Sequence, residues 1–484
     1  MRKMLSQLVQ RTSAVDPEVT GVTADSRRVK PGFLFAALPG SKVDGKAFAA
    51  KAVEAGAVAV IAAEDMPELG VPVIVTPDPR RVYALAARAF WGAQPPVVVA
   101  VTGTNGKTSV AGFCRQIFNR LGHRAASMGT LGVRATGPGL DEQITPAGLT
   151  TPDAADVAEL MSVLVAKGVT HLAMEASSHG IDQRRLDGAD LTAAGFLNLT
   201  QDHLDYHHTM EAYRDAKLRL FEALLPRGAT AVLNADSDAY GAFAAAAVGA
   251  GQSVLSVGEA GQGLKLVGHA PTPDGQALKI EAKGKTYDVV LPLAGAFQAS
   301  NALVAAGLCI AAGEPVDGVI SALGTLEGAP GRLQRVGTGA KGGEAYVDYA
   351  HTPDGLETVL KSLRPHVEGK LIVVFGAGGD RDRAKRPLMG LAAAQHADIA
   401  IVTDDNPRSE VPAAIRAEIL AGAPGSLEVG DRREAIRAGV ALMGPGDVLV
   451  VAGKGHEQGQ TVGSTVHPFD DVAEVAAALE AAHV

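Results

Sequence analysis

Short runs of apolar, mostly β-branched residues recur along the chain and alternate with amphipathic segments. The clearest run is VVVAV at 97–101, and the helical periodicity after it places Val110, Phe113 and Ile117 on one apolar stripe. The same pattern predicts helices over 48–55 and after 295, and strands over 32–38, 57–62, 169–174, 191–199, 230–233, 371–375, 399–402 and 448–451. Alternating strands and helices indicate an α/β protein built on parallel sheets.

The turn after the 97–101 strand carries the residue types of a phosphate-binding loop. Its glycines let backbone N–H groups close on an anion, Lys107 supplies a point charge, and Thr108 or Ser109 offers a hydroxyl to Mg²⁺. A glycine five positions before Gly106 would fall at Val101, inside the strand, so this loop is shorter than the common P-loop. The predicted ATP-binding residues here are Gly103, Thr104, Asn105, Gly106, Lys107, Thr108 and Ser109.

Polar residues follow two other predicted strands of the central region. Glu175 follows the 169–174 strand, and His203 follows the 191–199 strand. Ligands of open parallel sheets bind beyond the carboxyl ends of the strands, so Lys107, Glu175 and His203 are expected to face one site. Carboxylate oxygens are typical ligands of Mg²⁺. A zinc site made of neighbouring histidines is the alternative, although it lacks a distant partner; it would use His203, His207 and His208.

The loop TGTNGKT, followed in order by EASSHG at 175–180, DHLDYH at 202–207 and Lys217, resembles the Mur ligase family, whose members form amide bonds at the expense of ATP. The resemblance implies that Lys217 is carbamylated by CO₂, and that the catalytic residues are Lys107, Lys217 and His203. It implies Mg²⁺ ligands at Thr108, Glu175, His203 and Lys217, and further ATP contacts at Asn301, Arg332, Asp348 and His351. From the residues alone, a surface lysine, a helix cap and a linker arginine remain open explanations.

A second group of polar residues suits an acidic substrate. Thr150-Thr151-Pro152 predicts a helix start, because Thr is a common N-cap and Pro a common first helical residue. Solvated turns explain the other members of this group equally well. The family resemblance implies that the UDP-MurNAc-peptide substrate contacts Ala24, Ser26, Ser41, Lys42, Val43, Thr150, Thr151, Ser177, Gln183 and Arg185.

Three loops near the C-terminus, at 376–381, 404–408 and 453–457, each follow an apolar strand. The first is no dinucleotide fingerprint, because the third glycine of that motif would fall on Arg381. Arginines there can pair with carboxylates and acids with an ammonium group, which suits an amino acid; surface ion pairs are the alternative. DNPR at 405–408 resembles the signature of family members that select meso-diaminopimelate over lysine. The predicted amino-acid contacts are Arg381, Asp405, Asn406, Pro407, Arg408, Gly453 and Glu457.

The predicted architecture has three α/β domains. Residues 1–95 form a small UDP-sugar-binding domain, 96–331 a central P-loop-type parallel-sheet ATPase domain, and 332–484 a Rossmann-like domain that binds the amino acid. The resemblance implies an ATP-dependent ligase that adds meso-2,6-diaminopimelate to the D-Glu of UDP-MurNAc-L-Ala-D-Glu through an acyl phosphate, in peptidoglycan precursor synthesis. The alternatives are a lysine-adding ligase, a folylpolyglutamate synthase, and a nucleotide-operated switch without ligase chemistry.

Composition and net charge indicate the compartment of the protein and the kinds of partner to expect. The 484 residues are 47% hydrophobic, which is ample for several cores, and the net charge is −9 without a long basic run, which argues against nucleic-acid binding. Cys114 and Cys309 lie in apolar helical contexts and indicate a reducing compartment without disulfides. No signal peptide and no apolar stretch of about 18 residues occurs. We therefore expect a cytoplasmic monomer that acts on small molecules, without a membrane or nucleic-acid partner.

Overall fold

The computed structural model describes residues 1–10, 15–40, 44–272 and 275–482. These residues divide into two compact units: the first comprises 1–265 and 303–322, and the second comprises 266–302 and 323–484. The chain passes from the first unit to the second within β15 (Leu264–Thr272) and returns within α10 (Ala296–Ala311). Each unit contains its own hydrophobic clusters.

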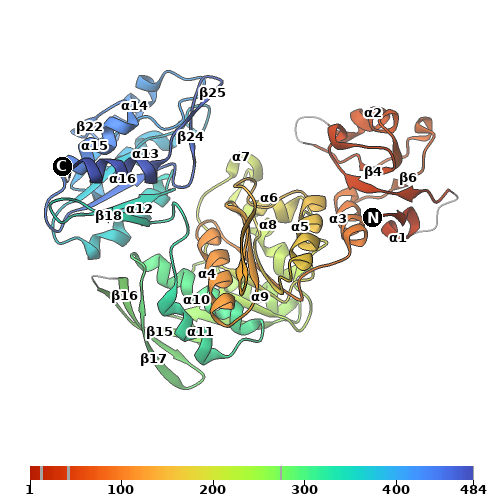
Figure 1. Cartoon of the computed structure of the whole chain (residues 1–484), viewed down its shortest axis with the longest axis horizontal. Coiled ribbons are helices and arrows are strands. Elements are labelled where there is room, and N and C mark those ends of the chain that lie inside the picture. The colour runs from red at the N-terminus through yellow and green to blue at the C-terminus, as the bar shows by residue number, and fades with distance from the viewer. Residues whose placement is uncertain (11–14, 41–43, 273–274, 483–484) are drawn as a thin grey trace. The chain divides into compact units, whose positions relative to one another are not determined.

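The first unit begins with a small parallel sheet in the order β3-β4-β5-β6 (Figure 1). Its strands are β3 (Gly21–Thr23), β4 (Phe33–Ala36), β5 (Ala57–Ala62) and β6 (Val73–Val75), after a short β1/β2 pair (Lys3–Met4 and Glu18–Val19). Its helices are α1 (Leu5–Val9), α2 (Ala49–Glu54) and α3 (Pro79–Trp91). The strand predicted over 57–62 is confirmed, and the one predicted over 32–38 is shorter.

Helix α3 attaches this small sheet to the rest of the first unit. It packs against α5 (Ala154–Ala166), whose Ala154, Ala155 and Ala158 join the same buried cluster as Tyr83 and Phe90 of α3. The buried Tyr83 hydroxyl donates a hydrogen bond to Asp153 at the start of α5. A segment that looked like a separate domain in the sequence thus shares part of its core with the neighbouring layer.

The larger sheet of the first unit has the strand order β10-β9-β8-β11-β7-β12-β13-β14. Its strands are β7 (Val97–Thr102), β8 (Ala125–Gly129), β9 (Gly132–Gly137), β10 (Leu140–Thr145), β11 (His171–Glu175), β12 (Ala193–Phe196), β13 (Thr230–Asn234) and β14 (Ser253–Gly258). The strands from β8 to β14 are parallel, and β9 and β10 extend them as an antiparallel hairpin. Pairing of Glu175 with Val101 and of Phe196 with Thr102 brings the carboxyl ends of three strands to one edge.

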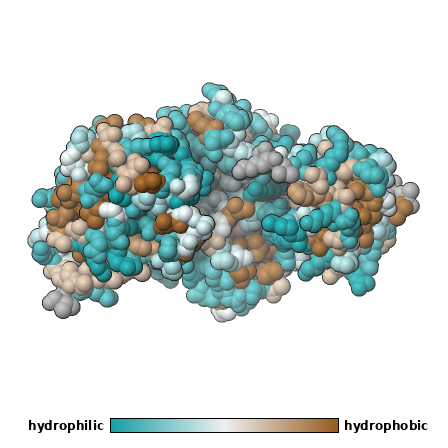
Figure 2. Space-filling model, turned by 90° about the horizontal axis from the view of Figure 1, so that it is seen from above, coloured by the Kyte–Doolittle hydropathy of each residue, from teal (hydrophilic) through white to brown (hydrophobic). Residues whose placement is uncertain are grey.

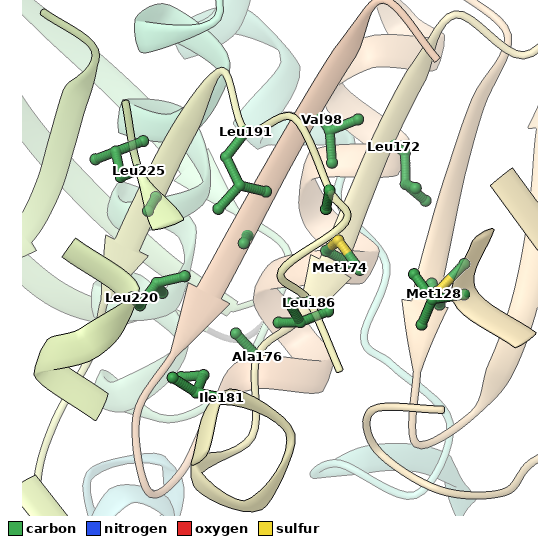
Figure 3. Packing of buried hydrophobic residues seen from close by; sticks show 14 of the residues in the cluster. Val98, Met128, Leu172, Met174, Ala176, Ile181, Leu186, Leu191, Leu220 and Leu225 are labelled. Atoms are coloured by element: carbon green, nitrogen blue, oxygen red, sulfur yellow. The ribbon is translucent and has the colours of Figure 1, made fainter. Parts of the chain in front are cut away.

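The helices of this region are α4 (Lys107–Arg120), α5, α6 (Ser178–Asp182), α7 (Leu204–His207), α8 (Met210–Arg219), which continues into a π-helical turn (Leu220–Leu224), α9 (Tyr240–Gly249) and α11 (Val316–Ala322). Apolar side chains of the sheet, including Val98, Leu172 and Met174, pack with those of the neighbouring segments (Figure 3). Both cysteines are buried free thiols.

Several predicted element ends in this region are wrong; the strand predicted over 169–174, for example, is β11, His171–Glu175. The helix expected to open at Thr150-Thr151-Pro152 begins instead at Ala154, because the Asp153 carboxylate accepts the hydrogen bond of the Ala155 N–H. The Thr151 hydroxyl is occupied elsewhere, since it donates to the Glu175 carbonyl oxygen. The strand predicted over 191–199 is shorter, and the residues after Phe196 form a loop.

The second unit is built on a sheet in the order β18-β19-β23-β20-β21-β22, parallel except for β18. Its strands are β18 (Gln334–Thr338), β19 (Glu344–Asp348), β20 (Leu371–Phe375), β21 (Ile399–Val402), β22 (Leu427–Glu428) and β23 (Val448–Ala452), and its helices are α12 (Pro353–Leu363), α13 (Lys385–His396), α14 (Pro412–Leu420), α15 (Arg432–Leu442) and α16 (Asp471–Ala482). Two hairpins add β16 (Gly275–Ala282) with β17 (Lys285–Leu291), and β24 (Gly459–Val462) with β25 (Thr465–Pro468).

Within the described part of the chain, no helix has the length and apolar character needed to cross a membrane. The face seen in Figure 2 is largely hydrophilic, with hydrophobic residues in small groups between the polar ones. Such scattered apolar exposure is ordinary for a folded protein surface.

Candidate active site

The loop between β7 and α4 requires glycine at two positions. Gly103 and Gly106 have φ angles of +156° and +90°, which side-chain-bearing residues rarely adopt. A Cβ added to Gly103 would lie 2.8 Å from Cβ of Leu197, at the end of the neighbouring strand. The loop is also held from outside: the Asn105 N–H donates to Oδ1 of Asn198 at 2.9 Å, and the Asn198 amide donates to the Asn105 carbonyl oxygen at 3.2 Å.

Two lysines converge on this loop. Nζ of Lys107 donates hydrogen bonds to the carbonyl oxygens of Gly103 and Thr104, both at 2.8 Å. Nζ of Lys217, from helix α8, donates to the same Gly103 oxygen at 2.9 Å. The sequence prediction that Lys107 and Lys217 serve one site is thus matched by their placement, although 110 positions separate them in the chain. Two amino groups at one carbonyl oxygen form a place where an anion is attracted.

The Lys217 amine is completely buried and packs over the Tyr213 ring, with Nζ 4.3 Å from the ring centroid. Burial lowers the pKa of Lys217 well below its usual value, the nearby Lys107 lowers it further, and Asp202 opposes the shift. The depressed pKa favours the neutral amine, which carries a lone pair. A helix-surface lysine, the open alternative from the sequence, is therefore the wrong description of this residue.

Two of the predicted metal ligands, Glu175 and His203, have surroundings that the structure describes in detail. Glu175 ends β11 and is buried; its carboxylate accepts hydrogen bonds from the Thr130 N–H at 2.9 Å and the Thr130 hydroxyl at 3.3 Å. The space for that carboxylate exists because residue 129 is glycine: a Cβ there would lie 2.0 Å from Oε1 of Glu175. Burial lowers the pKa of His203, as do Lys107 and Lys217, while Asp202 raises it.

The zinc alternative built on His203, His207 and His208 receives no support. In the ranges that the structure describes, the compact group of possible metal-ligating side chains lies elsewhere, at His123, His171 and Glu314. The donor set around the phosphate loop suits Mg²⁺ instead, because Glu175 contributes carboxylate oxygens and Thr108 a hydroxyl at the start of α4.

Five predicted substrate contacts form one connected network with Glu175. The Thr151 hydroxyl donates to the Glu175 carbonyl oxygen at 2.9 Å and lies 3.0 Å from the Ser177 hydroxyl, and the Thr130 hydroxyl lies 3.0 Å from that of Thr150. Arg185 donates to the Thr151 carbonyl oxygen at 2.6 Å and to the Gln183 amide oxygen at 2.8 Å. This arrangement places hydroxyl, amide and guanidinium groups beside the predicted metal ligand.

The predicted contacts in the small N-terminal sheet are less informative. Ala24 and Ser26 flank Asp25, whose carboxylate accepts from the Arg27 N–H and caps a short 3₁₀ turn. That turn chemistry accounts for the local sequence without a ligand. Ser41, Lys42 and Val43 lie outside the described residues.

In the second unit, the predicted ATP contacts cluster around Arg332. Its guanidinium lies over the Tyr349 ring at 4.4 Å, and its carbonyl oxygen accepts from Gln298, which in turn accepts from Asn301 at 3.1 Å. Asp348 is buried and accepts hydrogen bonds from the N–H groups of residues 333 and 350; burial raises its pKa against the effect of Arg332. Nδ1 of His351 lies 2.9 Å from the Tyr349 carbonyl oxygen.

Two of the loops predicted to bind an amino acid, 404–408 and 453–457, meet around Lys454, which was not among the predicted residues. Its buried Nζ donates to Oδ1 of Asn406 at 2.9 Å and lies 3.3 Å from Asp405 and 3.7 Å from Glu457. The Asn406 amide donates to Glu457 at 3.0 Å. The loop sequence GKGHE contained the lysine, but only the fold shows that it joins two loops. Gly453, at φ +122°, precedes it.

The two predicted arginines, Arg381 and Arg408, lie in the 376–381 and 404–408 loops. Arg408 has a left-handed backbone, with φ +51°, and its guanidinium donates to the Gly379 carbonyl oxygen at 2.7 Å. A Cβ on Gly379 would lie 1.9 Å from the Pro407 carbonyl oxygen, so the 376–381 and 404–408 loops are in close contact. A Cβ on Gly378 would lie 2.8 Å from Nη1 of Arg408 and 3.8 Å from Cγ of Arg381, which places both arginines beside this glycine.

Three residues that position other site residues were not predicted from the sequence: Asn198, Thr130 and Lys454. Each hydrogen-bonds to a predicted site residue instead of being one of the predicted contacts. Asn198 follows β12 at the sheet edge where ligands are expected, which was a usable signal. Thr130 lies in a turn before a polar hairpin and had no such signal.

Comparisons with known proteins agree along the whole chain. Three family models match it: "Mur ligase family, catalytic domain" at 18–91, "Mur ligase middle domain" at 101–309, and "Mur ligase, glutamate ligase domain" at 331–455. A UDP-N-acetylmuramoyl-L-alanyl-D-glutamate--2,6-diaminopimelate ligase of Caulobacter vibrioides is 70% identical over 99% of both chains, and one of Mesorhizobium japonicum is 54% identical over 97% of both.

A solved structure of a ligase with that same name is 34% identical, covers all of both chains and superposes with a TM-score of 0.74. The family models, the relatives and the fold therefore indicate the same family as the phosphate loop and its two lysines. The chain belongs to the Mur ligase family.

Proposed function

We propose that this chain is an ATP-dependent ligase that joins meso-2,6-diaminopimelate to the D-glutamyl carboxylate of UDP-MurNAc-L-Ala-D-Glu, in cytoplasmic peptidoglycan precursor synthesis. The main structural support for ATP binding at this loop is that Lys107 and Lys217 both donate hydrogen bonds to the Gly103 carbonyl oxygen. The names of relatives that are 54–70% identical over nearly the full length support the substrates. The chain would act as a monomer with domains at 1–95, 96–331 and 332–484, which light scattering and limited proteolysis can test.

The reaction needs no covalent enzyme intermediate. The glutamyl carboxylate attacks the γ-phosphorus of ATP, forming an acyl phosphate and releasing ADP. The amine of diaminopimelate then attacks the acyl carbon, so that the amide bond forms, phosphate leaves and the amine loses a proton. Lys107 stabilises negative charge on the transferred phosphoryl group, and backbone N–H groups of the loop orient it.

Glu175, His203 and Thr108 have the donor atoms to hold Mg²⁺ beside this loop. The Mg²⁺ ion, when bound, neutralises charge on the ATP phosphates. Thr130 fixes the Glu175 carboxylate through both its N–H and its hydroxyl, which keeps the oxygens in position before a metal arrives.

Lys217 is proposed to be carbamylated. Its neutral amine attacks CO₂, an N–C bond forms and the nitrogen loses a proton, which leaves a carbamate anion. The lowered pKa of Lys217 supports this step, because only the unprotonated amine is nucleophilic. The product anion relieves the repulsion with Lys107 and supplies an additional oxygen ligand for a metal.

In the second unit, Arg408 is proposed to bind the carboxylate that diaminopimelate has and lysine lacks. Asp405 and Glu457 are proposed to receive its ammonium group. A site built for a charged partner rejects an analogue without it, since the guanidinium is then left unsatisfied.

The deciding experiment measures phosphate release from ATP with UDP-MurNAc-L-Ala-D-Glu, adding meso-diaminopimelate or L-lysine in parallel, and weighs the product by mass spectrometry. Release with diaminopimelate alone, and a product heavier by that residue, is expected. Release with lysine alone would keep the ligase and overturn the assignment of Arg408. Release with neither would overturn the substrate assignment as a whole.

A further inference from the structure

Three potential metal ligands meet at the edge of the first unit's sheet that lies away from the phosphate loop. His123 lies between α4 and β8, His171 is the first residue of β11, and Glu314 lies between α10 and α11. Nε2 of His123 is 2.9 Å and Nε2 of His171 is 3.4 Å from the same Glu314 oxygen, Oε1, and the three ligand atoms lie within 4.8 Å of one another. His171 and Glu175 are the two ends of β11, four residue steps or roughly 13 Å apart.

The Thr170 hydroxyl is linked to the tautomer of His171. Its oxygen lies 3.3 Å from the Arg124 carbonyl oxygen and 2.8 Å from Nδ1 of His171, and it has one proton to donate. When the hydroxyl donates to Arg124, Nδ1 carries the imidazole proton and the lone pair of Nε2 faces a carboxylate oxygen; when it donates to Nδ1, the imidazole proton lies on Nε2. A metal ion bound at Nε2 selects the first of these tautomers.

In the tautomer with the proton on Nδ1, the cluster of His123, His171 and Glu314 favours a cation. A lone pair and a carboxylate oxygen repel each other, and the side chains of His171 and Glu314 are only 9% and 11% exposed, so water screens them poorly. Glu314 also follows the C-terminal end of α10, where the helix dipole disfavours an acid, and its N–H donates to the Cys309 carbonyl oxygen of the last turn. A proton on His123 or a divalent metal ion could supply the positive charge.

The geometry points to a zinc-binding site formed by His123, His171 and Glu314. Two imidazole nitrogens and one carboxylate oxygen are a ligand set typical of Zn²⁺. Zinc bonds of about 2.0–2.1 Å place tetrahedral ligand atoms about 3.3 Å apart, close to the 3.4 Å between His171 and Glu314. The Thr170 contact to the distal nitrogen of His171 is the outer interaction that metal-binding histidines normally have.

The surroundings favour this ion over Mg²⁺ and leave one coordination position open. Imidazole nitrogen suits zinc, whereas Mg²⁺ prefers oxygen ligands. The Phe118 ring packs on His171, with centroids 4.5 Å apart, and shields it from water. His123 is 33% exposed, so a water molecule can complete the tetrahedron from the solvent side. Bound zinc would tie together three segments of the first unit, away from the ligase reaction.

The test is zinc binding by the purified full chain. After incubation with Zn²⁺ and removal of the excess by gel filtration, metal analysis should find one equivalent that Glu314→Gln and His171→Asn lack. His467→Asn, on the exposed strand β25, is the matched control and should keep it, as should His203→Asn, which separates this site from the phosphate loop. Zinc should raise the Tm of the wild type and leave that of Glu314→Gln unchanged.

A spectrum of the wild type decides the question even where a variant fails to fold. Zinc X-ray absorption of the one-equivalent complex should show two imidazoles and additional oxygen ligands. No retained zinc, or zinc retained equally by Glu314→Gln, would overturn the site and leave a protonated His123–Glu314 ion pair as the explanation of the cluster. A spectrum with one imidazole or none would overturn it as well.

Discussion

Two buried lysines, one in each unit, have opposite electrostatic surroundings. Lys217 donates to one carbonyl oxygen beside a second lysine, Lys107, and its environment works against the charged form. Lys454 is equally buried, but two carboxylates lie within ion-pair distance and it also donates to the amide oxygen of Asn406 and the carbonyl oxygen of Gly459.

The difference shows that burial of a lysine does not by itself define its role. Beside the cationic Lys107, the Lys217 amine loses its proton more easily, and the site attracts an anion. Beside the acidic Asp405 and Glu457, the Lys454 ammonium group holds together two loops whose carboxylates would otherwise repel each other. Four predictions, taken in order of decreasing effect, test this comparison and the sites around the two lysines.

Lys217→Ala should cause the largest loss. Removing the amine removes the proposed carbamate, and we expect the rate of phosphate release to fall by about 10³-fold, which corresponds to about 4 kcal/mol in the reaction barrier. Lys361→Ala, at an exposed helix position, is the control and should keep full activity. Full activity of Lys217→Ala would refute the role of the carbamate, and partial rescue by short carboxylates would strengthen it.

Lys454→Met should destabilise the second unit by about 3 kcal/mol, because Asp405 and Glu457 then face each other without the cation. Lys217→Met should leave the stability of the first unit unchanged or raise it, since an unfavourably placed amine is replaced by an apolar side chain. Urea unfolding monitored separately in the two units measures both. Equal destabilisation by Lys454→Met and Lys217→Met would show that the two lysines do not differ in their effect on stability.

Arg408→Ala should lower kcat/KM for diaminopimelate by about 10–100-fold and reduce the preference over lysine by a similar factor. The loss arises because one substrate carboxylate no longer has a cationic partner. Arg433→Ala, which removes an ion pair with Glu474 and a contact with the Phe469 ring, should change neither value. An unchanged preference in Arg408→Ala would move the selectivity to another residue of the same loops.

The smallest effect concerns pH. Burial, followed by the nearby Arg332, lowers the pKa of His456 to about 4. Between pH 6.5 and 4 the unfolded chain therefore takes up a proton that the folded chain refuses, so stability present above pH 6.5 is lost as the pH falls. A fall of the pKa from 6.5 to about 4 corresponds to about 3 kcal/mol for a fully buried group, and the partial solvent exposure of the His456 ring reduces this. Relative to His456→Gln, the wild type should therefore lose about 1 kcal/mol over this range in urea unfolding curves. Parallel curves for both proteins would contradict the shift.

The sequence predicted best where a buried strand leads into a polar loop. The runs at 57–62, 371–375 and 399–402 match β5, β20 and β21 residue for residue, because strands buried on both faces are continuous apolar runs with sharp ends. The phosphate loop was identifiable for the same reason: its glycines and lysine have fixed spacing between such a strand and a helix. The Mur ligase family was correctly recognised from the motifs that follow it.

Features that depend on distant contacts were not predictable from the sequence. The hairpin of β9 and β10 is polar and half exposed, so it carries no apolar run. Asp153 rather than Thr151 caps α5 because the Thr151 hydroxyl is used by Glu175. The position of Asn198 after a strand was a usable signal, but the spacing of residues along the chain does not show that Asn198 holds Asn105, or that Lys454 pairs with Asp405 of another loop.

The absence of a side chain at Gly129 has a genetic consequence. Every amino-acid replacement at this position introduces at least a Cβ, which would fall within 2.5 Å of three side-chain atoms of the buried Glu175. A single missense change at codon 129 would therefore displace the carboxylate while codon 175 stayed intact. A screen for inactivating mutations should recover this glycine as readily as the glutamate.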